Sequence, residues 1–229
     1  MPPARLQASP LRYLRALRIG NRIEEISLEE NAGRLRVQST SRLAARDREQ
    51  VRASVARMFR LRDDLAPFYA MIAGDEQLGW AGTGAGRILA SPTVFEDVIK
   101  TICTTNCAWS ATVRMTTALV ARGGGAFPEV SLLARTPPAW YRDVARMGYR
   151  GPYVLAIAKD VAASRLDLEG LALSRAYDDA RLEELLLSLP GIGPYGAAHV
   201  MQLLGRHRPL VLDSWTRPKF LALTGKKQA

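Results

Sequence analysis

The sequence predicts a mainly α-helical protein with a small antiparallel β segment at its N-terminus. Three observations support this class. Residues 22–28 and 34–40 alternate polar and apolar side chains around a turn, as the strands of a hairpin do. From Arg46 onward, apolar residues recur at helical spacing in one segment after another. Residues 178–205 then have the pattern of two helices joined by a tight turn rich in proline and glycine.

The composition favours a polyanionic partner. The 229 residues include 32 basic and 22 acidic side chains, which gives a net charge of +10. Arginine greatly outnumbers lysine, which suits phosphate and base contacts, although genomic base composition can produce the same bias. The basic N-terminus has no apolar signal core, and no apolar run reaches membrane-spanning length. We therefore expect a monomeric cytoplasmic protein without a membrane partner, associated with the nucleoid if it is bacterial.

Residues 1–45 form the predicted β-containing segment, and residues 46–229 form the predicted helical domain. Leu11–Ile19 fits either a basic helix or a strand. The turn at residues 31–33 joins the two predicted hairpin strands. The first helix after Arg46 has an apolar face made of Val51, Val55, Met58 and Phe59.

The middle of the chain alternates helices with breaks. Residues 65–73 have a helical pattern, and the glycine-rich residues 82–87 form a loop that matches no phosphate-binding motif. Ser91-Pro92 predicts the start of a buried helix that is interrupted at residues 104–106. Further helices are expected at residues 109–120, 128–135, 138–147 and 153–162, with an exposed turn at 148–152.

The hairpin unit is the most informative stretch. Asp178 and Asp179 open its first helix, where acidic side chains complement the helix dipole. The turn 190–193 breaks that helix, Pro194 suits the first position of the next one, and Gly205 ends it. A glycine turn leading into a helix presents free N–H groups that can bind phosphate, although an ordinary helical hairpin shows the same pattern.

These residues carry a family resemblance. LPGIGPYGAAHV followed by LVLDSWTR resembles the helix-hairpin-helix (HhH-GPD) DNA glycosylases, with their Gly/Pro-rich loop and catalytic aspartate. FRLRDDLAPFY, GRILASPTVFEDVIKTICTTNCAWSATVRM and ARMGYRGPYV are similar to successive segments of the 8-oxoguanine and 3-methyladenine glycosylase II branch. The resemblance covers roughly residues 50–220. It implies base excision repair, in which the enzyme flips a damaged base out of double-stranded DNA.

The resemblance assigns the catalytic role to Asp213. Cleaving the bond between base and sugar requires a negative group beside the sugar cation that develops at the transition state. In the family this aspartate stabilises that cation and helps to activate water. Asp213 also suits a helix N-cap, and the two roles are compatible because accepted N–H bonds keep a carboxylate ionised.

Relatives that also cleave the DNA strand use a lysine two residues after the last glycine of the hairpin. Tyr195 occupies that position here, and a phenol cannot form an imine. The nearest lysine, Lys219, lies six residues beyond Asp213. The implied activity is therefore monofunctional hydrolysis of the glycosidic bond to an alkylated or oxidised purine.

The resemblance also implies a DNA-contacting surface. Asn106 matches the side chain that fills the gap left by the flipped nucleotide, and Tyr149 and Arg150 match residues that contact the orphaned partner base. A helix-end cap and an exposed turn are the structural alternatives. The hairpin adds Gly191, Gly193, Tyr195 and Gly196. Candidates for stacking on the base are Tyr195, Trp109 and Trp215, each of which also suits a core.

The cofactor expectations follow from the same pattern. The hairpin carbonyls of Leu187, Leu189 and Ile192 match those that hold a monovalent cation in relatives. Two cysteines, Cys103 and Cys107, cannot complete an iron–sulfur site, so no cofactor is expected to be required. Relatives continue with further helices after the aspartate, where this chain has sixteen more residues. The alternative reading is therefore a non-catalytic helix-hairpin-helix DNA-binding protein or an inactive, truncated glycosylase.

Overall fold

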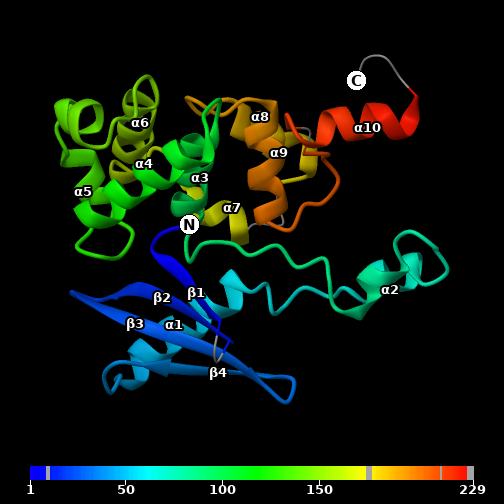
Figure 1. Cartoon of the computed structure of the whole chain (residues 1–229). Coiled ribbons are helices and arrows are strands. Elements are labelled where there is room, and N and C mark those ends of the chain that lie inside the picture. The colour runs from blue at the N-terminus through cyan, green and yellow to red at the C-terminus, as the bar shows by residue number, and fades with distance from the viewer. Residues whose placement is uncertain (9–10, 174–176, 212, 226–229) are drawn as a thin grey trace.

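The computed structural model describes residues 1–8, 11–173, 177–211 and 213–225. It shows a helical body above a small β-sheet, with the N-terminus between them and the C-terminal helix α10 at one edge (Figure 1). No helix in these described ranges is long and apolar enough to cross a bilayer. The predicted fold class, mainly α with an N-terminal antiparallel sheet, is confirmed.

The sheet contains four antiparallel strands in the order β1-β2-β3-β4: Ala4–Ala8, Leu11–Ile19, Arg22–Asn31 and Arg34–Ser39. The segment that fitted either a helix or a strand is strand β2, whose Tyr13 pairs with Leu28 of β3. The predicted hairpin is β3 and β4, closed by a turn with Asn31 opposite Arg34. The edge strand β1 was not predicted, because most of its five residues are exposed and show no apolar alternation.

Helix α1 (Ala45–Met58) packs on this sheet rather than on the helical body. Its buried face joins the inner face of the sheet in a separate apolar cluster that includes Leu17, Ile26, Leu28, Val51, Val55 and Met58. The boundary predicted at residue 45 separates strands from helices. The hydrophobic clusters instead divide the chain after α1, because an amphipathic helix belongs with the surface that buries it.

The remaining elements run from α2 to α10, with α2 set apart from the helical body (Figure 1). Their bounds are α2 Ala66–Ile72, a 3₁₀ turn Gly79–Thr83, α3 Val94–Thr104, α4 Trp109–Arg122, α5 Val130–Arg135, a π-helical turn Trp140–Val144, α6 Arg150–Ala162, α7 Leu168–Leu173, α8 Asp179–Leu187, α9 Pro194–Leu203 and α10 Thr216–Thr224. Helix α3 runs through the middle of the body and is buried at ten of its eleven positions. The predicted hairpin helices are α8 and α9.

Two predicted helix starts are wrong by a few residues. Helix α3 is capped by Thr93, whose hydroxyl accepts the Glu96 N–H at 3.2 Å, whereas Ser91 donates its N–H to Asp97. Helix α6 begins at Arg150 and not at Tyr153, so the expected exposed turn is shorter and Arg150 is buried. Pro152 falls within the first turn of α6, where the missing N–H costs no hydrogen bond.

The sheet and the helical body meet through buried charges. Arg15 of β2 and Lys100 of α3 both pair with Glu96, at 2.6 and 2.5 Å, and all three side chains are at most 10 % exposed. Arg57 of α1 pairs with Asp97 at 2.8 Å. Breaking such a pair leaves an uncompensated buried charge, so these pairs fix how the sheet sits against α3.

Candidate nucleic-acid interface and active site

The hairpin between α8 and α9 is shaped by close packing. The N-cap Asp178 accepts the Arg181 N–H at 2.8 Å, and the apolar faces of both helices are buried in the body core. Gly191 has a φ of +82°, and a Cβ built there would lie 2.6 Å from the ring of Tyr153 on α6. Only glycine satisfies both constraints, so the turn lies directly against α6.

Gly193 differs from Gly191 in its surroundings. Its φ of −100° is ordinary, it is exposed, and a Cβ built there meets no atom within 4 Å. Among the described residues no side chain caps α9. The first-turn N–H groups, including those of Tyr195 and Gly196, lack a partner within the helix and coincide with its positive dipole end. This end of α9 can therefore bind a phosphate without a basic side chain.

Asp213 lies just before α10 and is hydrogen-bonded within its own turn. Its Oδ1 accepts the N–H groups of Trp215 and Thr216 at 2.9 and 2.7 Å, and the Thr216 hydroxyl lies 2.9 Å away. The hydrogen bonds from Thr216 hold the pKa of Asp213 below its usual range. The carboxylate is therefore ionised at neutral pH and still partly exposed.

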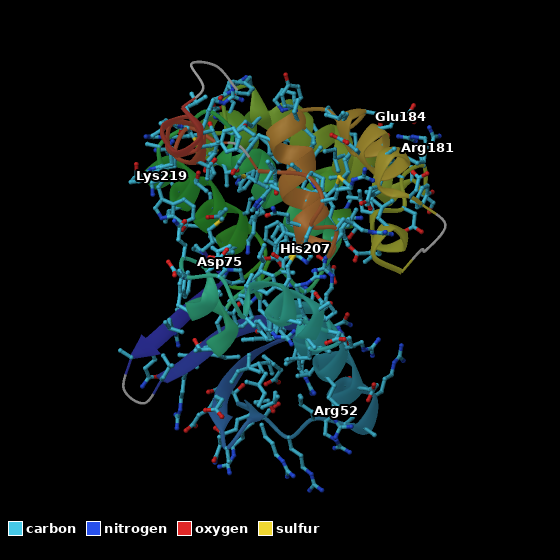
Figure 2. All side chains as sticks on the ribbon, turned by 90° about the vertical axis from the view of Figure 1, so that its right-hand side faces the viewer. Arg52, Asp75, Arg181, Glu184, His207 and Lys219 are labelled. Atoms are coloured by element: carbon cyan, nitrogen blue, oxygen red, sulfur yellow. The ribbon has the colours of Figure 1, made fainter. Side chains whose placement is uncertain are left out.

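A cavity of about 750 Å³, which we call the hairpin cavity, lies between the hairpin and residues on either side of Asp213, although Asp213 itself is not among the residues that line it. It is lined by Tyr195 of α9, by Glu183 of α8 and by Arg217, one helical turn after Asp213. Figure 2 shows α9 between α10, marked by Lys219, and α8, marked by Arg181 and Glu184. Leu212, part of the predicted apolar run, lies outside the described residues.

His199 is a candidate site residue that the sequence reasoning missed. Its ring stacks on that of Tyr195, with centroids 6.0 Å apart and planes within 9°. It lines a second cavity of about 240 Å³, between α9, α3 and the sheet, together with Asp97 and Lys100. Burial lowers the pKa of His199, and the smaller effect of the Asp97 charge raises it. The net shift is downward, so His199 is neutral at pH 7. The sequence signal that could have identified His199 is its position four residues after Tyr195, because residues at this spacing are neighbours on a helix surface.

The structure places the predicted DNA-contacting residues on two neighbouring turns. Asn106 is exposed in a left-handed conformation between α3 and α4. Tyr149 is 52 % exposed at the start of α6, whereas Arg150 is 7 % exposed and donates to the Thr105 carbonyl. Asn106 and Tyr149 are therefore accessible to DNA, and Arg150 is occupied within the protein.

The remaining predicted aromatic residues are not part of the core. Trp109 is 62 % exposed at the start of α4, three residues after Asn106. Trp215 is 72 % exposed, with the Lys219 ammonium 4.9 Å from its ring centroid. Neither lines the hairpin cavity, so Tyr195 is the one of the three candidates that does.

The predicted cation ligands are backbone carbonyls of the hairpin. Leu187 ends α8, and the Leu189 carbonyl accepts the Ile192 N–H at 3.1 Å, which leaves one lone pair for a ligand. Such neutral oxygens suit a weakly bound monovalent ion. The described residues contain no group of three His, Cys, Asp or Glu side chains that could hold a metal ion.

Comparison with known proteins identifies the fold. No protein-family profile and no curated protein matches the sequence. Among solved structures, 3-methyladenine DNA glycosylase from Archaeoglobus fulgidus is similar with a TM-score of 0.77 and 20 % identity, over 99 % of this chain and 80 % of that chain.

The 8-oxoguanine glycosylase/lyase of Clostridium acetobutylicum is similar in two structures. Its apo form gives a TM-score of 0.75 at 17 % identity, over 97 % of this chain and 77 % of that one. Its complex with double-stranded DNA containing cytosine opposite 8-oxoguanine gives a TM-score of 0.74 at 17 % identity, over 96 % of this chain and 75 % of that one. The chain therefore has the helix-hairpin-helix DNA glycosylase fold.

Proposed function

We propose that this protein is a monofunctional DNA glycosylase that removes an alkylated or oxidised purine in base excision repair. The observation that carries the proposal is a hydrogen-bonded, ionised carboxylate, Asp213, in a DNA glycosylase fold whose hairpin helix α9 has no side-chain cap. The net charge of +10 supports a polyanionic partner. The substrate class is drawn from neighbours named for 3-methyladenine and 8-oxoguanine.

The proposed chemistry assigns one step to each part of the site. The N-terminus of α9 binds the DNA backbone, and the damaged nucleotide leaves the helix to place its base beside the Tyr195–His199 stack. The C1′–N bond breaks with its electron pair leaving on the base, and Asp213 stabilises the sugar cation. A water molecule oriented by Asp213 adds to C1′ and loses its proton to solvent, which leaves an abasic site.

Strand cleavage is not part of the proposed reaction. A β-elimination through an imine needs an amine at the sugar, and Tyr195 supplies a phenol at the hairpin position. Lys219 is exposed on α10 with its ammonium against Trp215. We also propose that the carbonyls of Leu187, Leu189 and Ile192 hold a monovalent cation when DNA is bound.

The test is an incubation with duplexes that each carry one alkylated or oxidised purine: 1,N⁶-ethenoadenine, 7-methylguanine or 8-oxoguanine. The proposal predicts that at least one is cut only after hot alkali, and that borohydride traps no adduct. Cutting without alkali, together with a trapped adduct, would show a lyase. Tight binding with every lesion left intact would favour the non-catalytic alternative.

The cation is tested separately by measuring DNA affinity in potassium and in lithium chloride at equal ionic strength. A site built from neutral carbonyls discriminates between these ions, so the affinity should be higher in potassium. Equal affinities in the two salts would remove the cation from the proposal.

A further inference from the structure

The Arg150 side chain is buried against the protein, which differs from the DNA contact expected of it. Its side chain is 7 % exposed, although it follows Tyr149, which is 52 % exposed, in the chain. A guanidinium can donate five hydrogen bonds in a fixed plane, so its position is determined by its partners. Here the partners belong to the protein itself, and they lie on the turn that carries Asn106.

The first contact joins the α6 turn to the α3–α4 turn. Arg150 donates through Nη2 to the Thr105 carbonyl and through Nε to the Thr105 hydroxyl at 3.3 Å. Thr105 directly precedes Asn106, which has a φ of +44°. An asparagine tolerates this conformation better than most residues, but its backbone still has to be held there.

The second set of contacts reaches the hairpin. The Arg150 guanidinium lies 4.4 Å from the centroid of the Tyr149 ring, which packs edge-on against Tyr153 at 6.1 Å. Tyr153 in turn contacts Gly191, where even a Cβ would overlap the ring. A continuous chain of contacts therefore links the Asn106 turn, the Tyr149 turn and the hairpin.

We propose that Arg150 is a positioning residue that locks these three turns into one preformed DNA-facing surface. This inference rests on the proposed function, because it assumes that the three turns contact DNA. The alternative is that Arg150 leaves Thr105 when DNA binds and reads the orphaned base directly. The positioning role predicts an effect in the absence of DNA, and the reading role does not.

The experiment compares Arg150→Met and Arg150→Lys with the charge-matched control Arg146→Met, an exposed arginine in the preceding turn. Hydrogen–deuterium exchange of the free protein is measured for peptides covering residues 104–108 and 190–194. Loss of a buried hydrogen bond opens the structure locally, so we expect roughly tenfold faster exchange at 104–108 in Arg150→Met. Arg150→Lys should be intermediate, and the control should match wild type.

A second measurement separates positioning from general loss of structure. Asn106→Ala is combined with each arginine variant, and excision is measured on duplexes that differ in the base opposite the lesion. If Arg150 acts through Asn106, the loss of excision rate caused by Asn106→Ala should largely vanish in the Arg150→Met variant. The same loss should persist in the Arg146→Met variant. The loss caused by Arg150→Met should be the same for every opposite base.

Two results would overturn the positioning role. One is unchanged exchange at residues 104–108 together with a loss that depends on the opposite base, which would assign base reading to Arg150. The other is full additivity of the Asn106 and Arg150 substitutions. The exchange measurement needs neither DNA nor activity, so it tests the coupling of the turns even if no lesion is excised.

Discussion

The hairpin and the Asp213 segment, the two halves of the proposed site, are held in place by different forces. The hairpin rests on the apolar core, with Leu189 and Ile192 at most 7 % exposed and Gly191 against Tyr153. The Asp213 segment is held by hydrogen bonds within one turn. Its neighbours Leu210 and Trp215 are 69 % and 72 % exposed.

This difference suits the two tasks. Binding a DNA backbone requires N–H groups fixed in space, which close packing provides. A catalytic carboxylate needs to stay ionised and accessible to water, which accepted hydrogen bonds in a partly solvated turn provide. Changes at the hairpin should therefore affect affinity and stability, whereas changes at the Asp213 turn should affect the chemical step.

The largest effect is expected for Asp213→Asn. The amide oxygen can still accept the N–H groups of Trp215 and Thr216, so the turn should persist. The negative charge beside the sugar cation is lost, which should slow single-turnover excision by roughly a hundredfold to a thousandfold. The control Asp143→Asn removes an exposed carboxylate elsewhere and should leave the rate unchanged. Full activity of Asp213→Asn would refute the assigned mechanism.

The next effect separates the two hairpin glycines. Gly191→Ala forces a Cβ into Tyr153 at a positive φ, so it should lower the free energy of unfolding by about 1–3 kcal/mol. Gly193→Ala is sterically free within the protein, so it should lose less stability than Gly191→Ala, limited to the cost of about 1 kcal/mol or less for alanine at an N-cap. The methyl group of Gly193→Ala would point into open space at the end of α9 that is proposed to bind DNA, so affinity should fall by about tenfold, or about 1.4 kcal/mol. Chemical denaturation and DNA titration measure the two effects. Equal loss of stability in both variants would contradict this distinction.

A smaller effect is expected at Thr216. Thr216→Val removes a hydroxyl that lies 2.9 Å from Oδ1 of Asp213, while Thr216→Ser keeps it. Because these bonds hold the pKa of Asp213 low, their partial loss raises that pKa toward its ordinary value. As the pH is lowered, the excision rate of Thr216→Val should therefore decline at a higher pH than that of Thr216→Ser. The rate at neutral pH should change little. A pH–rate profile that is identical for the two variants would count against this.

The smallest effect concerns His199. Burial lowers its folded pKa, so below a pH of about 6.5 the unfolded chain binds a proton that the folded chain resists. Because the unfolded chain then binds more protons than the folded chain, His199 lowers the free energy of unfolding as the pH falls from about 6.5 toward the folded pKa. Above a pH of about 6.5 His199 causes no such loss. His199→Gln should flatten this part of the stability profile in thermal unfolding. An unaltered slope would show that His199 is solvated.

Much of this architecture could be predicted from local patterns. The periodicity of α1, α3, α8 and α9, the alternation of β3 and β4, and the role of Asp178 as a cap all depend on neighbours in sequence. The boundary error at Ser91 arose because two cap-like residues, Ser91 and Thr93, stand close together, and the contact of Ser91 with Asp97 leaves the cap to Thr93. The start of α6 was placed too late because the burial of Arg150 depends on its distant contact with Thr105.

The parts that could not be predicted depend on contacts between distant residues. Arg150 looked like a surface arginine, and its burial depends on Thr105, forty-five positions earlier. The pairing of Arg15 with Glu96 spans eighty-one positions. Gly191 and Gly193 look alike in the sequence, and they differ in the structure through the positive φ of Gly191 and its contact with Tyr153, which belongs to another helix. Asp213 was singled out by resemblance, and its hydrogen bonds to the following turn were within reach of local reasoning.

The central claim, that the hairpin binds and Asp213 cleaves, is tested most directly by single-turnover excision at increasing protein concentration. For Gly193→Ala, saturation should restore the wild-type rate, because only affinity is reduced. For Asp213→Asn, the rate should stay low at every concentration. A Gly193→Ala rate that remains as low at saturation as that of Asp213→Asn would contradict the division of roles.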